Sequence, residues 1–315
     1  MTRRVGAVDI GTNSTRLLVA DVSAEGGIAE VERQLEITRL GDRVDAERRL
    51  TGEAIARVRT AIERYAARAA VLEAEAVLAV ATSAVRDAEN GREFLAEVAD
   101  AHGFVPRLLT GEEEAEMTYR GVCSRLAVGA GTLICDIGGG STELILGGPE
   151  GVRDRASVNI GCVRMSERHL HADPPTKAEL AALRAEAVAA LPARLTGAAR
   201  DLVGVAGTVT TLATIDMGLE FEIPEAIDGH RLPAEAVERL LGELAVLPLA
   251  KRRLVRGLMP ERAPTIVAGA VILSAVVAAT GAAAVVVSER DILHGAVLAA
   301  ASILEQGNPK ERESS

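Results

Sequence analysis

Aromatic side chains make up only 2% of the 315 residues, and tryptophan is absent. The interior must therefore be built mainly from Ala, Val, Leu and Ile. Cysteine is also rare, because only Cys123, Cys135 and Cys162 occur, and no two of them have C-x-x-C spacing. This odd, scattered set argues against a disulfide framework and against a zinc site. We therefore expect a reducing, cytoplasmic location.

The sequence also lacks an excess of basic residues, since its formal net charge is −10. A broad nucleic-acid-binding surface normally needs a basic balance, so an anionic ligand would have to be bound in a local pocket. The N-terminal segment has no uninterrupted apolar stretch, because Asp9 and Asn13 fall within it. We expect no secretion signal.

Charge is missing altogether from the run Ile266 to Val287, which is about as long as a membrane span. This run consists largely of Ala, Val and Gly, and Gly281 divides it. It is better explained as a buried helix over 265–280 followed by a buried strand over 283–288. We expect no membrane association.

Hydrophobic periodicity and turn residues predict the same order of elements twice. In the first half we expect strands at 5–10, 15–22, 28–40, 77–82 and 104–109, and helices at 52–72, 91–102 and 112–126. In the second half we expect strands at 132–137, 142–146, 152–160, 202–206 and 283–288. Helices are expected at 162–170 and 177–195, from Thr208, after Pro233, and at 265–280 and 292–304.

This repeated order predicts an α/β protein with two duplicated domains, spanning 1–124 and 125–305, that face each other across a cleft. The last helix, 292–304, either closes the second domain or packs back toward the first. The polar segment 306–315 is expected to be a flexible tail.

A short motif strengthens the case for duplication. Asp9 to Leu18 reads DIGTNSTRLL, and Asp136 to Ile145 reads DIGGGSTELI. A glycine-rich turn between paired strands exposes backbone N–H groups that can bind phosphate oxygens, and the serine hydroxyls add donors. Asp136 and Glu143 are suited to a hard cation. An ordinary glycine turn is the alternative explanation, and it is weaker for two matching copies than for one.

The doubled turn resembles the phosphate loops of the superfamily that contains sugar kinases, actin and the heat-shock chaperone ATPases. Five segments together resemble the exopolyphosphatase/guanosine pentaphosphate phosphohydrolase (Ppx/GppA) family: DIGTNSTRLL, TSAVRDAENG, GEEEAEMTYRGV, DIGGGSTELI and VGVAGTVTTLA. Their order and spacing match across essentially the whole chain. The resemblance implies two ribonuclease H-like, actin-like ATPase domains with a central cleft.

The segment LLTGEEEAEMTYRGV presents three glutamates at a predicted helix start. Thr110 and Glu113 have the spacing of a capping box, which explains Glu113 without a catalytic role. The resemblance implies that Glu114 is the catalytic base. We expect Arg86, just beyond a buried strand, to be the second catalytic residue, because it could bind a phosphate bidentately. A solvated loop arginine is the alternative explanation.

The sequence from Asp201 to Ala213 predicts a strand, a turn of small residues and a helix start, which is another anion site. Close helix–strand packing is the alternative explanation for its glycine. The resemblance implies a divalent metal, Mg²⁺ or Mn²⁺, on Asp136 and Glu143. The phosphate-binding set that we expect is Asp9, Gly11, Thr12, Asn13, Ser14, Gly138, Gly139, Gly140, Ser141, Gly207 and Thr208.

The resemblance implies an exopolyphosphatase that releases terminal orthophosphate from inorganic polyphosphate, with guanosine pentaphosphate as a second substrate and a homodimer as a possible assembly. Long family members carry an extra C-terminal helical region, and the only obvious basic run here is Lys251 to Arg256. We therefore expect short chains to be preferred. Two alternatives stay open: a sugar or acetate-type kinase, and a non-catalytic actin-like nucleotide-binding protein.

The sequence departs from the family pattern in two places. Pro264 stands where an acidic residue is usual, and Ile292 to Gly295 reads ILHG in place of Leu-Arg-Glu-Gly. These changes affect the expected nucleotide-side contacts and leave the phosphate loops unchanged.

Overall fold

A computed structural model describes residues 2–305, and these divide into two compact units. Unit 1 contains residues 2–125 and 292–305, and unit 2 contains Leu126–Asp291. The helix that was expected to close the second domain or to return to the first, α14 (Ile292–Glu305), is thus part of unit 1.

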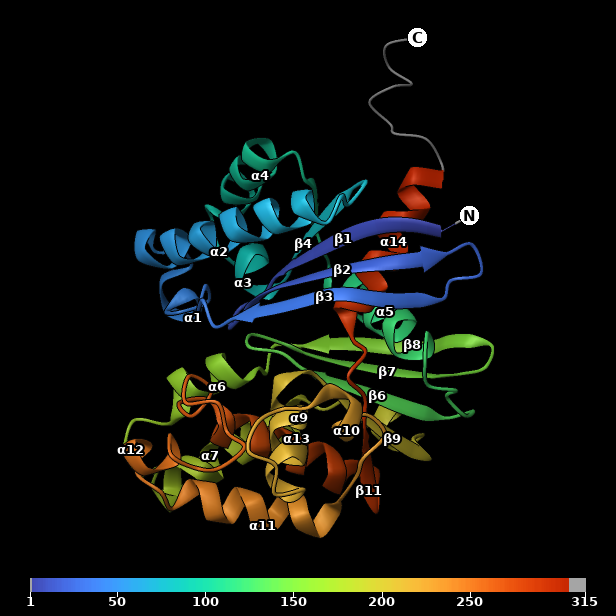
Figure 1. Cartoon of the computed structure of the whole chain (residues 1–315). Helices are drawn as coiled ribbons and strands as arrows, with labels where there is room; N and C mark the ends of the chain where they lie inside the picture. Colours follow the sequence, from blue (N-terminus) through green and yellow to red (C-terminus); the bar gives the residue numbers. More distant parts are fainter. Residues whose placement is uncertain (1, 306–315) are drawn as a thin grey trace. The chain divides into compact units, whose positions relative to one another are not determined.

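Unit 1 is built on a five-stranded sheet with the order β3-β2-β1-β4-β5 (Figure 1). Its strands are β1 (Thr2–Ile10), β2 (Thr15–Ser23), β3 (Ile28–Glu36), β4 (Val77–Ala81) and β5 (Val105–Leu108). The first three form an antiparallel meander, and β4 and β5 continue the sheet parallel to β1. The carboxyl ends of β1, β4 and β5 therefore meet at one edge.

Helices cover both faces of this sheet, because side chains alternate along each strand. Val8 and Ile10 pack in one core with α2 (Gly52–Val71) and α4 (Gly91–His102). Val5 and Ala7 face the other way, into a core shared with α14 and with Met117 of α5 (Gly111–Cys123). Two short helices, α1 (Val44–Glu47) and α3 (Ser83–Asp87), complete the unit.

Unit 2 has a six-stranded sheet with the order β10-β11-β9-β6-β7-β8. Its strands are β6 (Thr132–Ile137), β7 (Thr142–Gly148), β8 (Gly151–Val158), β9 (Asp201–Val205), β10 (Arg231–Pro233) and β11 (Ala284–Val287). The antiparallel meander β6-β7-β8 again leads into parallel strands, β9 and β11.

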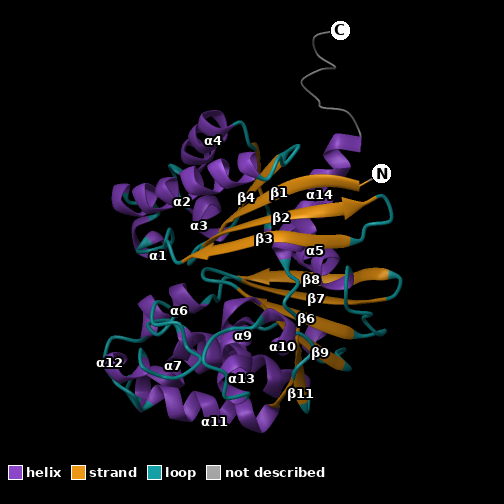
Figure 2. Cartoon of the chain, in the orientation of Figure 1, coloured by secondary structure: helices purple, strands orange, loops and turns teal. Residues whose placement is uncertain are grey.

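The helices of unit 2 pack around one large core that contains residues of β6, β7, β9 and β11 (Figure 2). Most of α13 (Ile266–Thr280) is buried there. The other helices are α6 (Cys162–His169), α7 (Lys177–Ala190), α8 (Ala193–Thr196), α9 (Ala206–Asp216), α10 (Pro224–Ile227), α11 (Ala234–Ala245) and α12 (Leu249–Arg252).

The two sheets repeat one topology. The order β3-β2-β1-β4-β5 in unit 1 corresponds to β8-β7-β6-β9-β11 in unit 2, with the same parallel and antiparallel pairs. Strand β10 is an addition at the edge of unit 2. The predicted α/β class and the predicted duplication are confirmed.

Several predicted boundaries are wrong for identifiable reasons. The strand expected over 28–40 ends at Glu36, because the chain then turns onto the loop after β1, where the Arg39 amide donates to the Asn13 carbonyl. The helix expected over 177–195 breaks at Leu191 and Pro192, since proline has no amide hydrogen to continue it. Strand β10 was not predicted, because its three residues are too few to give a periodic signal.

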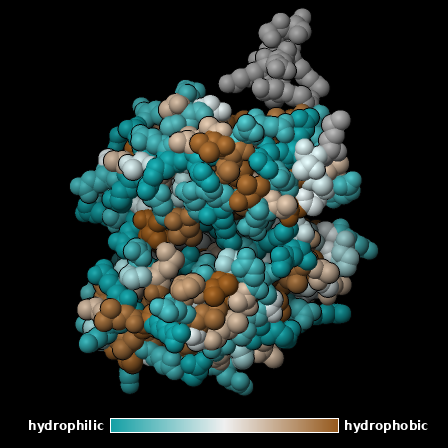
Figure 3. All heavy atoms as spheres, viewed as in Figure 1, coloured by the Kyte–Doolittle hydropathy of each residue, from teal (hydrophilic) through white to brown (hydrophobic). Residues whose placement is uncertain are grey.

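The uncharged run forms a helix, α13, and a strand, β11, as predicted. Among residues 2–305, none of the helices has the length and apolar character that crossing a membrane requires. In Figure 3 the visible surface of each unit is mostly hydrophilic, with smaller hydrophobic patches between. The expected tail, 306–315, lies outside the described residues.

Candidate active site

In unit 1 the predicted phosphate loop forms the tight turn between β1 and β2. The Gly11 amide donates to the Ser14 carbonyl over 3.0 Å. A Cβ added at Gly11 would lie 2.9 Å from the same oxygen, so a side chain there would push the turn open. Thr12 is buried, whereas Asn13 and Ser14 are half-buried at the tip.

The turn between β6 and β7 in unit 2 repeats this geometry. The Gly138 amide donates to the Ser141 carbonyl, again over 3.0 Å. A Cβ at Gly138 would lie 3.1 Å from that oxygen. The sequence repeat therefore encodes the same hydrogen-bonded turn twice.

Helix α6 binds the carbonyl side of the second turn. The amides of Cys162 and Val163 donate to the carbonyls of Gly138 and Gly139, over 2.9 and 2.8 Å, and Arg164 Nε donates to the Gly140 carbonyl over 2.7 Å. In a trans peptide the N–H points opposite to the C=O. The three amides that follow these carbonyls are therefore directed away from α6, as in an anion-binding nest.

Gly161 allows this close contact. A Cβ at Gly161 would lie 2.3 Å from the Gly139 carbonyl oxygen and 2.4 Å from the Gly140 nitrogen. Only glycine lets the start of α6 approach the turn backbone this closely.

The two turns differ in the residue paired with the aspartate. In unit 1 the strand register places Asp9 opposite Arg16, and Arg16 Nη2 donates to Asp9 Oδ2 over 2.7 Å. In unit 2 the same register places Asp136 opposite Glu143. Both carboxylates are buried, with exposed fractions of 6% and 0%. The first aspartate thus has an arginine as its counterion, whereas the second stands beside another acid.

The acidic pair is buried, and its charges act on a neighbouring thiol. Ser157 Oγ donates to Glu143 Oε1 over 2.7 Å. The neighbouring Cys135 thiol has a raised pKa, first because it is buried and then because the negative charges of Asp136 and Glu143 oppose a thiolate. A divalent cation bound by oxygen atoms would relieve the repulsion between these two carboxylates.

Arg86 and Glu114, predicted separately as a phosphate ligand and a base, form an ion pair in unit 1. Arg86 Nη1 donates to Glu114 Oε2 over 3.1 Å and to the Leu109 carbonyl over 2.8 Å. Arg86 follows β4 and Glu114 follows β5, so both lie at the strand edge where β1 ends in the Gly11 turn. Glu114 is 7% exposed.

Glu113, the neighbouring residue, has the capping role that its spacing predicts. Thr110 Oγ1 accepts from the Glu113 amide, and Glu113 Oε2 accepts from the Thr110 amide. This backbone hydrogen bond, with Arg107 close by, lowers the pKa of the Glu113 carboxyl. Glu113 is therefore used at the helix end, while the next residue along, Glu114, is directed inward.

The turn between β9 and α9 contains Gly207 and Thr208. Ala206, just before them, has a left-handed backbone with φ 67°, an uncommon conformation for a residue with a Cβ. Gly207 lies against the Arg262 guanidinium, since a Cβ there would fall 2.9 Å from Arg262 Cζ. Thr208 lies against Gly269 of α13, where an added Cβ would be 2.3 Å from Thr208 Oγ1.

Sequence reasoning did not identify Arg262. Its Nη1 donates to the Gly207 carbonyl, to Thr211 Oγ1 and to Glu222 Oε2, over 2.8 to 3.1 Å. The guanidinium is thus a buried cation at this turn, and it comes from a position far along the chain. Arg16, Ser157 and Gly161 were also missed, because only strand register and helix packing bring them to the turns.

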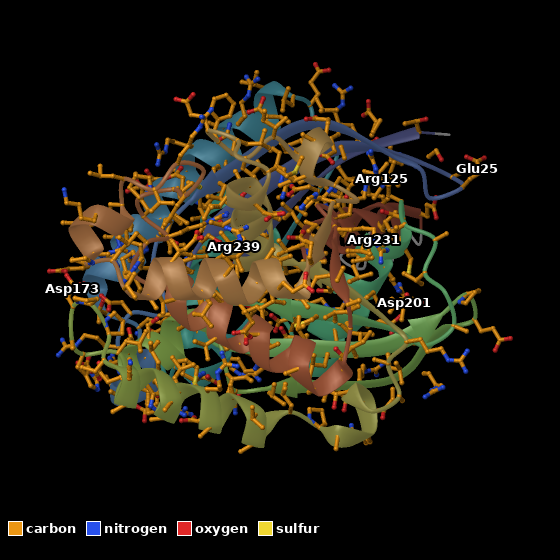
Figure 4. All side chains as sticks on the ribbon, turned by 90° about the horizontal axis from the view of Figure 1, so that it is seen from below. Glu25, Arg125, Asp173, Asp201, Arg231 and Arg239 are labelled. Atoms are coloured by element: carbon orange, nitrogen blue, oxygen red, sulfur yellow. The ribbon has the colours of Figure 1, made fainter. Side chains whose placement is uncertain are left out.

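The predicted basic run, Lys251 to Arg256, is only partly available as a second polyphosphate-binding surface. Arg252 is 4% exposed and donates to the carbonyls of Leu244, Leu247 and Ala263. The start of α12 is held by Asp173, labelled in Figure 4, whose Oδ1 accepts from the Leu249 amide over 2.7 Å. Arg252 thus has a structural role, which weakens the run as an anion-binding surface.

The structure brings the predicted site residues together within each unit. Unit 1 gathers the Gly11 turn, Arg86 and Glu114 at one sheet edge, and unit 2 gathers the Gly138 turn, Asp136, Glu143, Gly207 and Thr208 at the equivalent edge. Within residues 2–305, no group of three or more His, Cys, Asp or Glu side chains is arranged to hold a metal. Any metal here would need ligands besides protein carboxylates.

Known proteins resemble this chain in sequence and in fold. The family model described as "Ppx/GppA phosphatase family" matches residues 18–302. Exopolyphosphatase 2 of Mycobacterium tuberculosis is 40% identical, with 95% of this chain and 98% of that protein aligned. The chain belongs to the Ppx/GppA phosphatase family.

One solved structure matches this chain in length and fold, and a longer relative aligns over about half of its own length. The crystal structure of an exopolyphosphatase-like protein superposes with a TM-score of 0.88 at 35% identity, covering 96% of this chain and 99% of that one. A guanosine-5'-triphosphate,3'-diphosphate pyrophosphatase of Aeromonas salmonicida is 29% identical over 86% of this chain and 54% of its own length. As a Ppx/GppA phosphatase the protein is a hydrolase, and the predicted family is confirmed.

Proposed function

We propose that this protein is an exopolyphosphatase that releases terminal orthophosphate from inorganic polyphosphate. The observation that carries the proposal is the buried Glu114 carboxylate, 3.1 Å from Arg86, at the sheet edge that also carries a phosphate turn. Membership of the phosphatase family and the 40% identity to an exopolyphosphatase support the choice of substrate.

In this proposal the glycine turns bind the terminal phosphates. The amides after Gly138, Gly139 and Gly140, together with the Ser141 hydroxyl, form the donor set of one turn, and the matching turn at Gly11 supplies another. Such donors stabilise charge without needing to reorganise during the reaction. Gly207 and Thr208 would contribute backbone donors at the start of α9.

Glu114 is the proposed general base. It would accept a proton from a water molecule as the water oxygen attacks the terminal phosphorus. The bond from that phosphorus to the bridging oxygen breaks, and the bridging oxygen stays with the shortened chain. Arg86 would hold Glu114 in position and bind the transferring phosphoryl group through its remaining N–H donors.

Mg²⁺ or Mn²⁺ is the proposed cofactor, held by Asp136 and Glu143. Their donor atoms are carboxylate oxygens, which fit a hard cation rather than zinc. Two protein carboxylates fill only part of the octahedral shell of Mg²⁺, and this ion commonly completes its shell with water and substrate phosphates. When bound, the cation would neutralise charge that develops on the phosphate oxygens.

Guanosine pentaphosphate is the second candidate substrate, because a guanosine-5'-triphosphate,3'-diphosphate pyrophosphatase is among the relatives. Its terminal phosphoanhydride presents the same reacting group as a polyphosphate end. We place the reaction in the reducing cytoplasm, since Cys123, Cys135 and Cys162 are all free thiols.

One assay separates this function from the two alternatives. Polyphosphate, guanosine pentaphosphate and ATP are incubated side by side with the protein and Mg²⁺, and orthophosphate and ADP are measured. We expect orthophosphate from polyphosphate without ADP formation. A kinase would instead transfer phosphate from ATP to an acceptor, and a non-catalytic nucleotide-binding protein would bind ATP and release nothing.

A further inference from the structure

A segment of unit 1 that no motif identified is fastened directly to the Gly11 turn. It is the loop between β3 and α1, drawn in teal in Figure 2. The Arg39 amide donates to the Asn13 carbonyl over 2.9 Å, and the Gly41 amide donates to the Thr12 carbonyl over 2.8 Å. A Cβ at Gly41 would lie 2.1 Å from Thr12 Cγ2, so the two backbones are in close contact.

Arg39 sits in this loop with an unfavourable backbone. Its φ is 50°, in the left-handed region where glycine and asparagine are favoured. The neighbouring Thr38 and Leu40 are buried, with exposed fractions of 2% and 0%, whereas Arg39 is exposed. Arg57 holds the conformation in place, since its Nε donates to the Thr38 carbonyl over 2.7 Å and its Nη2 donates to the Arg39 carbonyl.

The backbone alone does not explain an arginine at this position. The amide hydrogen bond to Asn13 and the carbonyl bonds from Arg57 would be made equally well by glycine, without the steric strain. A strained residue that is hydrogen-bonded to a phosphate turn is a candidate for a functional side chain. The side chain of Arg39 is long, exposed and always charged.

The charge balance of the turn indicates what that use is. Arg16 lies opposite Asp9 in the strand register, and its guanidinium forms two hydrogen bonds to Asp9 Oδ2. The Asp9–Arg16 pair therefore adds no net positive charge. A polyphosphate end carries roughly one negative charge per phosphate, and the Gly11 turn needs a further cation to hold it.

We propose that Arg39 is a substrate-binding residue. Its guanidinium binds a phosphate of the polyphosphate chain next to the phosphate that is bound at the Gly11 turn. This inference rests on the proposed function and adds a specificity-determining residue to it. A guanidinium binds non-esterified phosphate oxygens bidentately, and it would discriminate in favour of substrates with a second phosphate next to the terminal one.

The test compares Arg39→Gly, Arg39→Lys and the parent protein on tripolyphosphate over a salt series. Arg39→Gly should raise KM about tenfold at low salt, the usual scale for a charge-assisted hydrogen bond, with kcat within twofold. Its KM should also depend less on salt, because one screened attraction is gone. Arg39→Lys keeps the charge and should recover part of the affinity.

The matched control for backbone strain is Glu73→Gly. Glu73 also has a left-handed backbone, with φ 56°, and its charge acts on Arg4, at the opposite end of β1 from the Gly11 turn. Both glycine variants should unfold at the same temperature as the parent or higher, since both relieve strain. Glu73→Gly should leave KM unchanged. A lowered Tm for Arg39→Gly alone, or an unchanged KM, would overturn the proposal.

The proposed function can fail independently. If the parent binds tripolyphosphate in calorimetry but releases no orthophosphate, the hydrolase assignment fails, and the same three proteins are compared by Kd. A tenfold weaker Kd for Arg39→Gly would still support the role of Arg39. Equal Kd values would overturn it, and so would a parent protein that does not bind tripolyphosphate.

Discussion

At the scale of single residues, the duplicated turns show how one substitution separates two roles. Asp9 and Asp136 occupy the same position at the end of equivalent strands. Arg16 lies opposite the first and Glu143 opposite the second, so one turn carries an internal ion pair and the other a pair of buried acids. Two acids side by side, as in the second turn, suit a divalent cation bound by oxygen atoms.

This difference predicts which aspartate controls the metal requirement. Asp136→Asn and Glu143→Gln should each raise the Mg²⁺ concentration for half-maximal activity by about tenfold or more, because each removes an anionic ligand. Asp9→Asn is the matched control in the other turn, and it should leave that concentration unchanged. Titrating the activity of each of the three variants with Mg²⁺ measures this concentration. Full activity of the parent in excess EDTA would contradict a role for the metal.

Glu114 and Glu113 provide a second residue-scale test, because they are adjacent but have different surroundings. Glu114→Gln should lower kcat at least ~100-fold, the usual scale for a positioned general base, while polyphosphate binding is kept. Glu113→Gln should reduce the free energy of unfolding by about 0.5 kcal/mol through the weakened helix cap and should leave kcat nearly unchanged. Steady-state kinetics and thermal unfolding are measured on both. An equal loss of kcat would mean that Glu114 has no special role.

At the scale of elements, the capping boxes at α5 and α7 fix where these helices begin. At α7 the Glu179 carboxylate accepts from the amides of Thr176, His171 and Ala172. These hydrogen bonds, that from Thr176 first, lower the pKa of Glu179 to about 2. Because the pKa of Glu179 is lower in the folded state, its carboxylate stabilises the fold at pH values above the unfolded-state pKa. This contribution is lost as the pH falls through the folded-state pKa.

The α7 cap therefore predicts the pH range over which Glu179 stops stabilising the protein. The Tm difference between the parent and Glu179→Gln should be constant above about pH 5 and should shrink as the pH falls from the ordinary glutamate value near 4.3 toward 2. Calorimetric Tm values at a series of pH values measure this difference. A difference that grows on acidification would show that the cap is not the cause.

The contact between α6 and the Gly138 turn is an element-scale feature that a single added methyl group would disturb. Gly161→Ala should displace the turn, because its Cβ would overlap the Gly139 carbonyl. We expect a loss of about 1–3 kcal/mol in stability together with a large fall in kcat/KM. Gly242→Ala, in α11 with open space around it, should be neutral or stabilising. Normal kinetics for Gly161→Ala would show that the turn does not bind substrate.

The sequence predicted the elements whose signals are local. Helix α4 and strand β6 have the expected bounds, and the capping box at Thr110 is present. It did not predict Arg262 beside Gly207, or the Arg39 loop on the Gly11 turn. Those contacts join residues far apart in the chain, and a single sequence carries no pattern that pairs them.

At the scale of the whole molecule, a chain with a net charge of −10 must bind a polyanion through local groups. The buried role of Arg252 removes one cation from the only basic run that the sequence offered as a remote binding surface. The preference for short polyphosphates and the homodimer stay predictions. Gel analysis of a partial digest would show a gradual downward shift of long chains if they are trimmed distributively.

The central claim is that water attacks the terminal phosphorus of polyphosphate, and hydrolysis in H₂¹⁸O tests it most directly. The released orthophosphate and the shortened chain are analysed separately by mass spectrometry. The proposed mechanism predicts one ¹⁸O atom in each orthophosphate at a single turnover and none in the shortened chain, because the bridging oxygen stays with the chain. Label in the shortened chain, or no orthophosphate release, would contradict it.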